Sequence, residues 1–201
     1  MVQINIQHGR LLEPFFQFYH QNCKDPTLIT GGWDKWVIPD KEKLKKRIQA
    51  YRNVWSEYDK KVIDGISSVL GLSFNREVID IFIVSGSSRS MSNPLIIGSQ
   101  HLPDDFIVIL SHELVHRILA INESEILTTI QSVISKFAAE ENEVVKNHII
   151  IFAVLRKIFE DDIKLLRKVI PNRNNHYKRA YHLTEPYGKI LEYFRNRENL
   201  K

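Results

Sequence analysis

The residues with the clearest chemistry in this sequence are two histidines and a glutamate: His112, Glu113 and His116. They form the pattern His-Glu-x-x-His inside a segment, 105–121, whose apolar residues recur at helical spacing. On a helix, residues four apart are offset by only about 40°, so both imidazoles leave the same face one turn apart. Two neutral ring nitrogens can then reach one divalent ion at about 2.0–2.1 Å each. The spacing therefore predicts a zinc site with His112 and His116 as ligands.

Glu113 adds a general base to this pair. It lies about 100° around the helix from His112, too far to be a comfortable ligand but near enough to take a proton from water at the metal. Ile109, Val115 and Leu119 share the face of the two histidines, so the pair lies among apolar residues and not among charges. The alternative interpretation is a pair of buried histidines satisfied by the backbone, because a buried pair without a partner is costly.

Length and composition indicate one globular domain. The chain has 201 residues, of which 43% are hydrophobic and 26% charged, which suffices for a full core. The longest apolar run, 149–155, is too short to span a bilayer, and no basic region followed by an apolar stretch opens the chain. Cys23 is the only cysteine, which excludes an intramolecular disulfide and favours a reducing compartment. We therefore expect a cytoplasmic protein with no membrane partner.

The charge pattern gives no support for a nucleic-acid partner. The net charge is +4 and the isoelectric point is near 9.1. Basic residues concentrate at 41–47 and 167–178, but acidic residues are interleaved, and the first run falls on the polar face of an expected helix. No basic stripe alternates with aromatic residues as it does in many nucleic-acid-binding surfaces. We expect solvated helix faces at both segments.

Hydrophobic periodicity predicts a small sheet and helices before the metal-site segment. Alternation predicts a strand at 2–7, and β-branched residues predict another at 77–84. Apolar residues at helical spacing predict one uninterrupted helix between an N-cap at Asp40 and Gly71. The aromatic residues at 11–19 are expected to be packed, and 24–39 is expected to be a surface loop held in place by Trp33 and Trp36. Further along, we expect a mobile connection at 85–93 and an edge strand at 94–98.

Further helices are expected after the metal-site helix. They are predicted at 143–160, at 161–170 up to Pro171, at 176–186, and over a terminal amphipathic segment at 183–201.

The order of a long helix, strands, an edge strand and the His-Glu-x-x-His helix resembles the catalytic half-domain of zincin metallopeptidases. More narrowly, the chain is similar to a poorly characterised group of bacterial zincin-like proteins. The similarity covers roughly the second half of the chain and rests on 94–97, His112 to His116, Asn147-His148-Ile149 with Ala153, and Tyr-Lys-Arg-Ala-Tyr at 177–181. In that fold an extended substrate pairs with the edge strand above the metal. The resemblance therefore implies a peptide or protein substrate.

A catalytic zinc site needs a third protein ligand besides an open position. The metzincin pattern is excluded, because Leu119 and Asn122 stand where it has Gly and His. The gluzincin pattern asks for Glu followed three residues later by Asp or Ala, which does not fit Glu140, Glu141 or Glu143.

His148 is the best candidate for the third ligand, because it projects from the centre of the apolar face of the helix expected at 143–160. Glu141 is the reserve if that helix begins early, whereas Glu143 points more than about 120° away from His148. A core histidine with a backbone partner is the alternative for His148.

The resemblance also implies a side chain that stabilises the developing oxyanion, commonly Tyr, His or Arg in zincins. Tyr177, Arg179 and Tyr181 are the candidates, and the two tyrosines share a helix face. Aromatic packing is the ordinary alternative for both tyrosines.

We predict an α+β, zincin-like single domain over 1–201. Its N-terminal helices and small mixed sheet occupy 1–104, and the metal-site helix and C-terminal helices occupy 105–201. The predicted function is zinc-dependent hydrolysis of peptide bonds, with zinc held by His112, His116 and His148 and with Glu113 as general base. The competing hypothesis is a non-catalytic, zincin-derived binding module whose metal is structural or lost.

Overall fold

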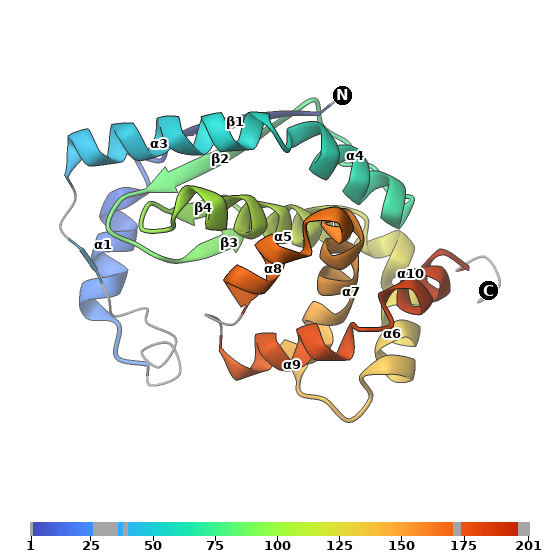
Figure 1. The fold of residues 1–201 in the computed structure, drawn as a ribbon. Helices are drawn as coiled ribbons and strands as arrows, with labels where there is room; N and C mark the ends of the chain where they lie inside the picture. Colours follow the sequence, from blue (N-terminus) through green and yellow to red (C-terminus); the bar gives the residue numbers. More distant parts are fainter. Residues whose placement is uncertain (1, 26–35, 38–39, 171–173, 197–201) are drawn as a thin grey trace. The chain divides into compact units, whose positions relative to one another are not determined.

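The computed structural model describes residues 2–25, 36–37, 40–170 and 174–196. Within them the fold is mixed α+β with a small four-stranded mixed sheet, as predicted (Figure 1). The chain divides into two compact units that interleave along the sequence, 1–59 with 76–113 and 60–75 with 114–201. The division falls within one continuous helix, α5 (Pro103–Ile121), directly after Glu113.

The sheet belongs to the first unit and has the strand order β1-β2-β4-β3. β1 pairs in parallel with β2, β2 pairs in parallel with β4, and β3 pairs antiparallel with β4. The strands predicted at 2–7 and 77–84 are confirmed, because β-branched residues on the buried face hold them in the core. The four strands are β1 (Gln3–His8), β2 (Val78–Val84), β3 (Ser90–Ser92) and β4 (Leu95–Gly98).

The strand predicted at 94–98 is confirmed as β4, but its expected position at the edge of the sheet is wrong. β4 lies between β2 and β3, and the described sheet ends at β3 on that side. The mobile connection predicted at 85–93 instead contains β3 and is held by buried hydrogen bonds. His20 Nε2 and Ser87 Oγ are 3.1 Å apart, and Gly98 lies so close to the backbone of Ser87 that a Cβ atom would collide with it. Short polar strands of this kind carry little periodicity, which explains the miss.

Helix α3 (Lys41–Ser56) lies along β1 in the first unit (Figure 1). The Asp40 side chain caps it by accepting the backbone N–H groups of Glu42 and Lys43, each at 3.0 Å. The Arg52 guanidinium donates to the Ile6 carbonyl of β1 through two nitrogens, at 2.9 and 2.7 Å. These bonds fix the helix on the sheet.

The prediction of one uninterrupted helix between Asp40 and Gly71 is wrong, because the structure has two helices in this segment. α3 ends at Ser56, and α4 (Asp59–Leu70) begins a new helix that belongs almost wholly to the second unit. The break is a tightened last turn, in which Tyr58 N–H bonds three residues back to Trp55 O at 2.9 Å. Apolar spacing continues across such a turn, so periodicity does not reveal it. The predicted end is confirmed, because Gly71 has φ 63°.

The aromatic cluster at 11–19 was predicted to be packed, which is wrong for most of its members. It lies on α1 (Glu13–Asn22), where the side chains of Phe15 and Phe18 are 73% and 68% exposed. His20 is the buried residue of this helix. Most of the loop predicted at 24–39, including Trp33, lies outside the described residues, whereas Trp36 contacts the His20 ring with centroids 5.6 Å apart.

Helix α7 is the core of the second unit. It contacts α6, α8, α9 and α10, and its side chains from His148 to Leu155 are all buried. In place of the helix predicted at 161–170, the structure has a 3₁₀ turn followed by helix α8. Within the described residues, the predicted terminal helix corresponds to α10. The elements are α6 (Glu123–Phe137), α7 (Glu143–Ile158), η1 (Glu160–Asp162), α8 (Ile163–Val169), α9 (Asn175–Leu183) and α10 (Tyr187–Arg195). Among the described helices, none combines the length and apolar character needed to cross a bilayer.

Candidate metal centre

Helix α5 carries His112, Glu113 and His116, as the sequence predicts. Pro103 opens it, and acidic residues lie in its first turn, where the helix dipole favours negative charge. Side chains on both sides of the motif are buried, so the motif enters the interior. His112 and Glu113 are themselves only 8% and 7% exposed. Polar groups this deeply buried need specific partners.

Helix α7 supplies His148 and fixes the orientation of its ring. Asn142 caps this helix by accepting the Val145 backbone N–H at 3.1 Å, which starts the helix one turn before His148. Nδ1 of His148 lies 2.6 Å from the Val144 carbonyl oxygen. A carbonyl only accepts, so Nδ1 carries the proton and Nε2 carries the lone pair. A histidine with its Nδ1–H on a carbonyl is oriented in the same way as many metal ligands.

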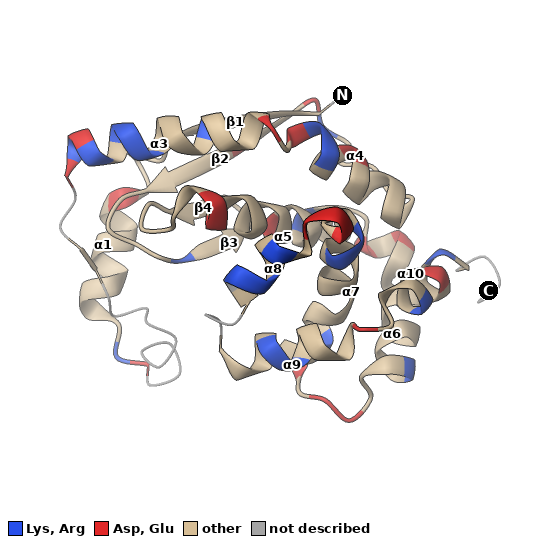
Figure 2. Cartoon of the chain, viewed as in Figure 1, with Lys and Arg blue, Asp and Glu red and all other residues tan. Residues whose placement is uncertain are grey.

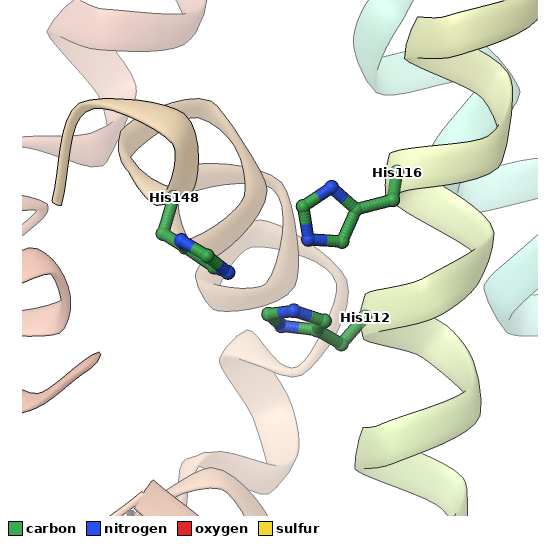
Figure 3. A group of neighbouring side chains, drawn as sticks. All are labelled: His112, His116 and His148. Carbon is green, nitrogen blue, oxygen red and sulfur yellow. The ribbon is translucent and has the colours of Figure 1, made fainter. Parts of the chain in front are cut away.

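The structure brings His112, His116 and His148 together, with one ring nitrogen of each within 4.8 Å of the others (Figure 3). The rings of His116 and His148 meet edge to face, with centroids 5.1 Å apart and planes at 86°. Two of these histidines come from successive turns of α5 and the third comes from α7. The three histidines therefore lie close enough to hold one metal ion.

Burial favours the neutral form of His116 and His148. It lowers the pKa of His116 to about 4, with a smaller contribution from the charge of the neighbouring His148. Burial also lowers the pKa of His148, although the hydrogen bond to Val144 opposes this shift. Neutral imidazoles offer lone pairs to a cation, whereas imidazolium ions repel one another and the metal.

The metal-free protein should lose stability as the pH falls from 6.5 to about 4. In this window the His116 ring takes up a proton in the unfolded chain but not in the folded one, so unfolding binds protons. The difference between the two pKa values corresponds to roughly 3 kcal/mol at most. Urea unfolding of chelator-treated protein at several pH values measures it. His116→Gln should flatten the dependence, and an equally steep curve for this variant would contradict the assignment.

The carboxylate of Glu113 is held by the edge strand of the sheet. Ser90 of β3 donates its hydroxyl to Glu113 Oε1 at 2.7 Å, and both residues belong to the first unit. This contact could not be predicted from the sequence, because the pattern of 85–93 indicates a connection and 23 positions separate the two partners. A hydrogen bond to an ionised carboxylate both stabilises the charge and fixes the direction of the group. The Ser90 hydroxyl thus contributes to the orientation of Glu113.

The predicted oxyanion residues have different surroundings in the second unit. The Tyr177 ring lies beside His148, with centroids 4.3 Å apart. Tyr181 is 8% exposed and packs with Phe152 and under the Arg156 guanidinium, which matches the aromatic-packing alternative. Arg179 pairs with Glu141 at 2.7 Å, on the exposed side of α9.

The two carboxylates considered as third ligands are both engaged elsewhere. Glu141 accepts two hydrogen bonds from Arg179 and precedes α7. Glu143 lies in the first turn of α7, is 79% exposed and pairs with Lys146 at 3.1 Å. Neither belongs to the group of three histidines.

Comparison with known proteins adds no family. No family model matches this sequence, and neither a curated protein nor a solved structure is significantly similar to it. The assignment of a function therefore depends on the site itself.

Proposed function

We propose that this protein is a zincin-like, zinc-dependent hydrolase that cleaves peptide bonds. The observation that carries the proposal is the cluster of three histidines, of which His112 and His148 are buried and His116 is partly buried, with the buried Glu113 directly following His112 on α5. Three neutral imidazoles are a donor set that suits zinc. The Nδ1–H bond of His148 to Val144 and the low pKa of His116 both support such a role.

The chemistry divides between the metal and the side chains of this chain. When bound by three protein ligands, zinc lowers the pKa of water to about 7 and polarises a carbonyl group. Glu113 removes a proton from the attacking water and then delivers it to the leaving amine. The hydroxyl of Ser90 keeps one carboxylate oxygen of Glu113 in place during this exchange. Tyr177, whose ring lies beside His148, is the proposed oxyanion stabiliser. Tyr181 is a weaker candidate for this role, because its ring packs against Phe152.

A peptide is the proposed substrate, on the strength of the resemblance and of the strand that holds Glu113. β3 is one of the two edge strands of the described sheet, and its residue Ser90 contacts the proposed general base. An extended peptide that adds to this edge would pass the carboxylate of Glu113. We propose a cytoplasmic site of action, since the lone Cys23 suits a reducing compartment.

Elemental analysis and a peptide-library assay test the proposal together. The purified protein should contain about one zinc per chain, because the cluster offers ligands for one ion. Cleavage of the library at pH 7 should stop on chelation and return with zinc. Zinc uptake without any cleavage would favour the non-catalytic binding module. Failure to take up zinc would remove the proposed function altogether.

Ser90→Ala should lower kcat and leave zinc content unchanged. The variant removes the hydroxyl that donates to Glu113 Oε1, so the base loses its fixed direction. Hydrogen bonds to charged groups contribute about 1.5–3 kcal/mol, which corresponds to roughly a 10- to 150-fold loss. Ser90→Thr retains a hydroxyl and a strand-forming residue and should recover most of kcat. Ser88→Ala, in the exposed loop before β3, is the matched control, and an equal loss there would point to a general effect on the loop.

A further inference from the structure

A concave site separate from the histidine cluster lies in the first unit, at the ends of two strands. A cavity of about 520 Å³ opens between α3 and the residues that follow β2 and β4. This volume falls in the range of small-molecule sites, about 300–1,000 Å³. β2 and β4 are parallel neighbours, and the crevice beyond the carboxyl ends of parallel strands is where open α/β sheets bind ligands. The residues that define its two walls are Lys43, Leu44, Lys46, Arg47 and Ala50 of α3, and Ser85, Gly86, Ser99 and Gln100 after the strands.

The helical wall of this cavity is positively charged. Lys43, Lys46 and Arg47 share one face of α3 because they are three and four positions apart. Figure 2 shows Lys and Arg along this helix. The one acidic residue among those lining the cavity is Asp40, whose Oδ1 caps the helix and whose Oδ2 lies 3.6 Å from Lys43. Lys46 and Arg47 form no ion pair within the described part of the chain.

Arg47 is the least exposed of these cations. Its side chain is half-buried, and its guanidinium lies over the Tyr51 ring, 6.0 Å from the centroid. Tyr51 is itself fixed, because its ring stacks on Phe106 and its hydroxyl donates to the His101 carbonyl at 2.7 Å. A guanidinium that is held against a fixed aromatic ring and has no carboxylate partner can direct two N–H donors toward an oxyanion.

The opposite wall adds neutral polar groups. Ser99 follows β4, and its backbone N–H bonds to Val84 O of β2 at 2.9 Å, so the two strand ends stay together. Gln100 is anchored here because its side-chain amide donates to the Gly86 carbonyl at 2.6 Å. The wall therefore combines a fixed backbone with a half-buried serine, opposite two cations that form no ion pair with any described residue.

We propose that this cavity binds a small phosphorylated molecule, with Lys46 and Arg47 contacting the phosphoryl group and Ser99 beside it. A phosphomonoester carries nearly two negative charges at neutral pH, which matches two adjacent unpaired cations. Arginine binds phosphate through two parallel hydrogen bonds, and lysine adds a point charge. The site uses residues that the proposed hydrolytic centre does not, so it stands whether or not the protein is a peptidase.

Calorimetry and thermal unfolding with glycerol 3-phosphate and inorganic phosphate, at constant ionic strength, test this site. Both probes should bind and raise Tm. Lys46→Gln and Arg47→Gln should each weaken binding by about 10-fold or more, because each removes a charge-assisted contact. Lys45→Gln is the matched control, since it removes the same charge from an exposed position of α3 outside the cavity.

Three results would overturn the proposal. The first is that neither phosphate probe binds. The second is that Lys45→Gln weakens binding as much as Lys46→Gln, which would indicate attraction by the overall charge of the helix. The third is that succinate, a dianion without a phosphoryl group, binds as tightly as glycerol 3-phosphate. Thermal unfolding of each variant without probe checks that the substitution has left the fold intact.

Discussion

Glu113→Gln should retain zinc and lose turnover. The amide has the shape of the carboxylate and still offers an oxygen to the Ser90 hydroxyl, so the buried position stays filled and hydrogen-bonded. The three histidines remain unchanged. What disappears is the group that accepts a proton from water. General acid–base catalysis contributes about 10²–10⁴-fold, so kcat should fall by that amount. Measurement of zinc stoichiometry and of kcat on the same preparation tests both halves of the expectation.

Glu143→Gln is the matched control for this experiment. It makes the same chemical change at an exposed glutamate in the first turn of α7, one that pairs with Lys146 and lies outside the histidine cluster. Zinc content and kcat should both stay as in the parent. Loss of zinc from Glu113→Gln would show that Glu113 is a ligand or a structural residue, and unchanged kcat would show that another group serves as base.

The part of the site that lies on one helix could be predicted from the sequence. His112 and His116 are four residues apart, and a helix with buried neighbours on both sides places their rings together whatever the rest of the fold does. His148 could also be found, because the apolar residues of α7 define a face and His148 lies within it. Its bond to Val144 O spans one helical turn, so it too is a local feature.

Contacts between distant segments were not predictable in this way. Ser90 approaches Glu113 only because β3 pairs with β4 at the edge of the sheet, and a three-residue polar strand has too short a pattern to reveal itself. The order β1-β2-β4-β3 depends on tertiary hydrogen bonds, so the sequence pointed to the wrong strand as the edge. The exposed aromatic residues of α1 show a related limit, since hydrophobic side chains are also found on surfaces.

The break between α3 and α4 has a similar cause. The apolar stripe continues from Trp55 to Val62 and beyond, so the sequence describes one long amphipathic surface. The structure divides that surface between two helices of different units, because α3 ends in a tightened turn at Tyr58 and α4 begins directly after it. The spacing of apolar residues along 40–71 predicts that this segment is helical. It does not predict where the first helix ends, because that depends on the elements against which each half of the segment packs.

His148→Ala should abolish tight zinc binding, because it removes one of three ligands and the only one on α7. Loss of a group that merely orients a ligand usually costs 10- to 100-fold in metal affinity, so loss of the ligand itself should cost more than about 100-fold. Zinc at a thousand times its Kd stabilises the parent by about 4 kcal/mol, and a 100-fold weaker site leaves about 1.4 kcal/mol at the same concentration. The zinc-induced rise in Tm should therefore shrink by about two-thirds or more.

Two further variants separate the loss of a ligand from damage to the core. His148 is buried beside Phe152 and Tyr177, so alanine leaves a cavity, and His148→Gln fills more of that space while it lacks the imidazole nitrogen. Both should lose the zinc response, although their Tm values without zinc will differ. His182→Ala, at an exposed position of α9, should keep the full response. If His148→Gln shows the same zinc-induced rise in Tm as the parent, the imidazole of His148 is not needed for zinc binding. The third ligand would then lie elsewhere.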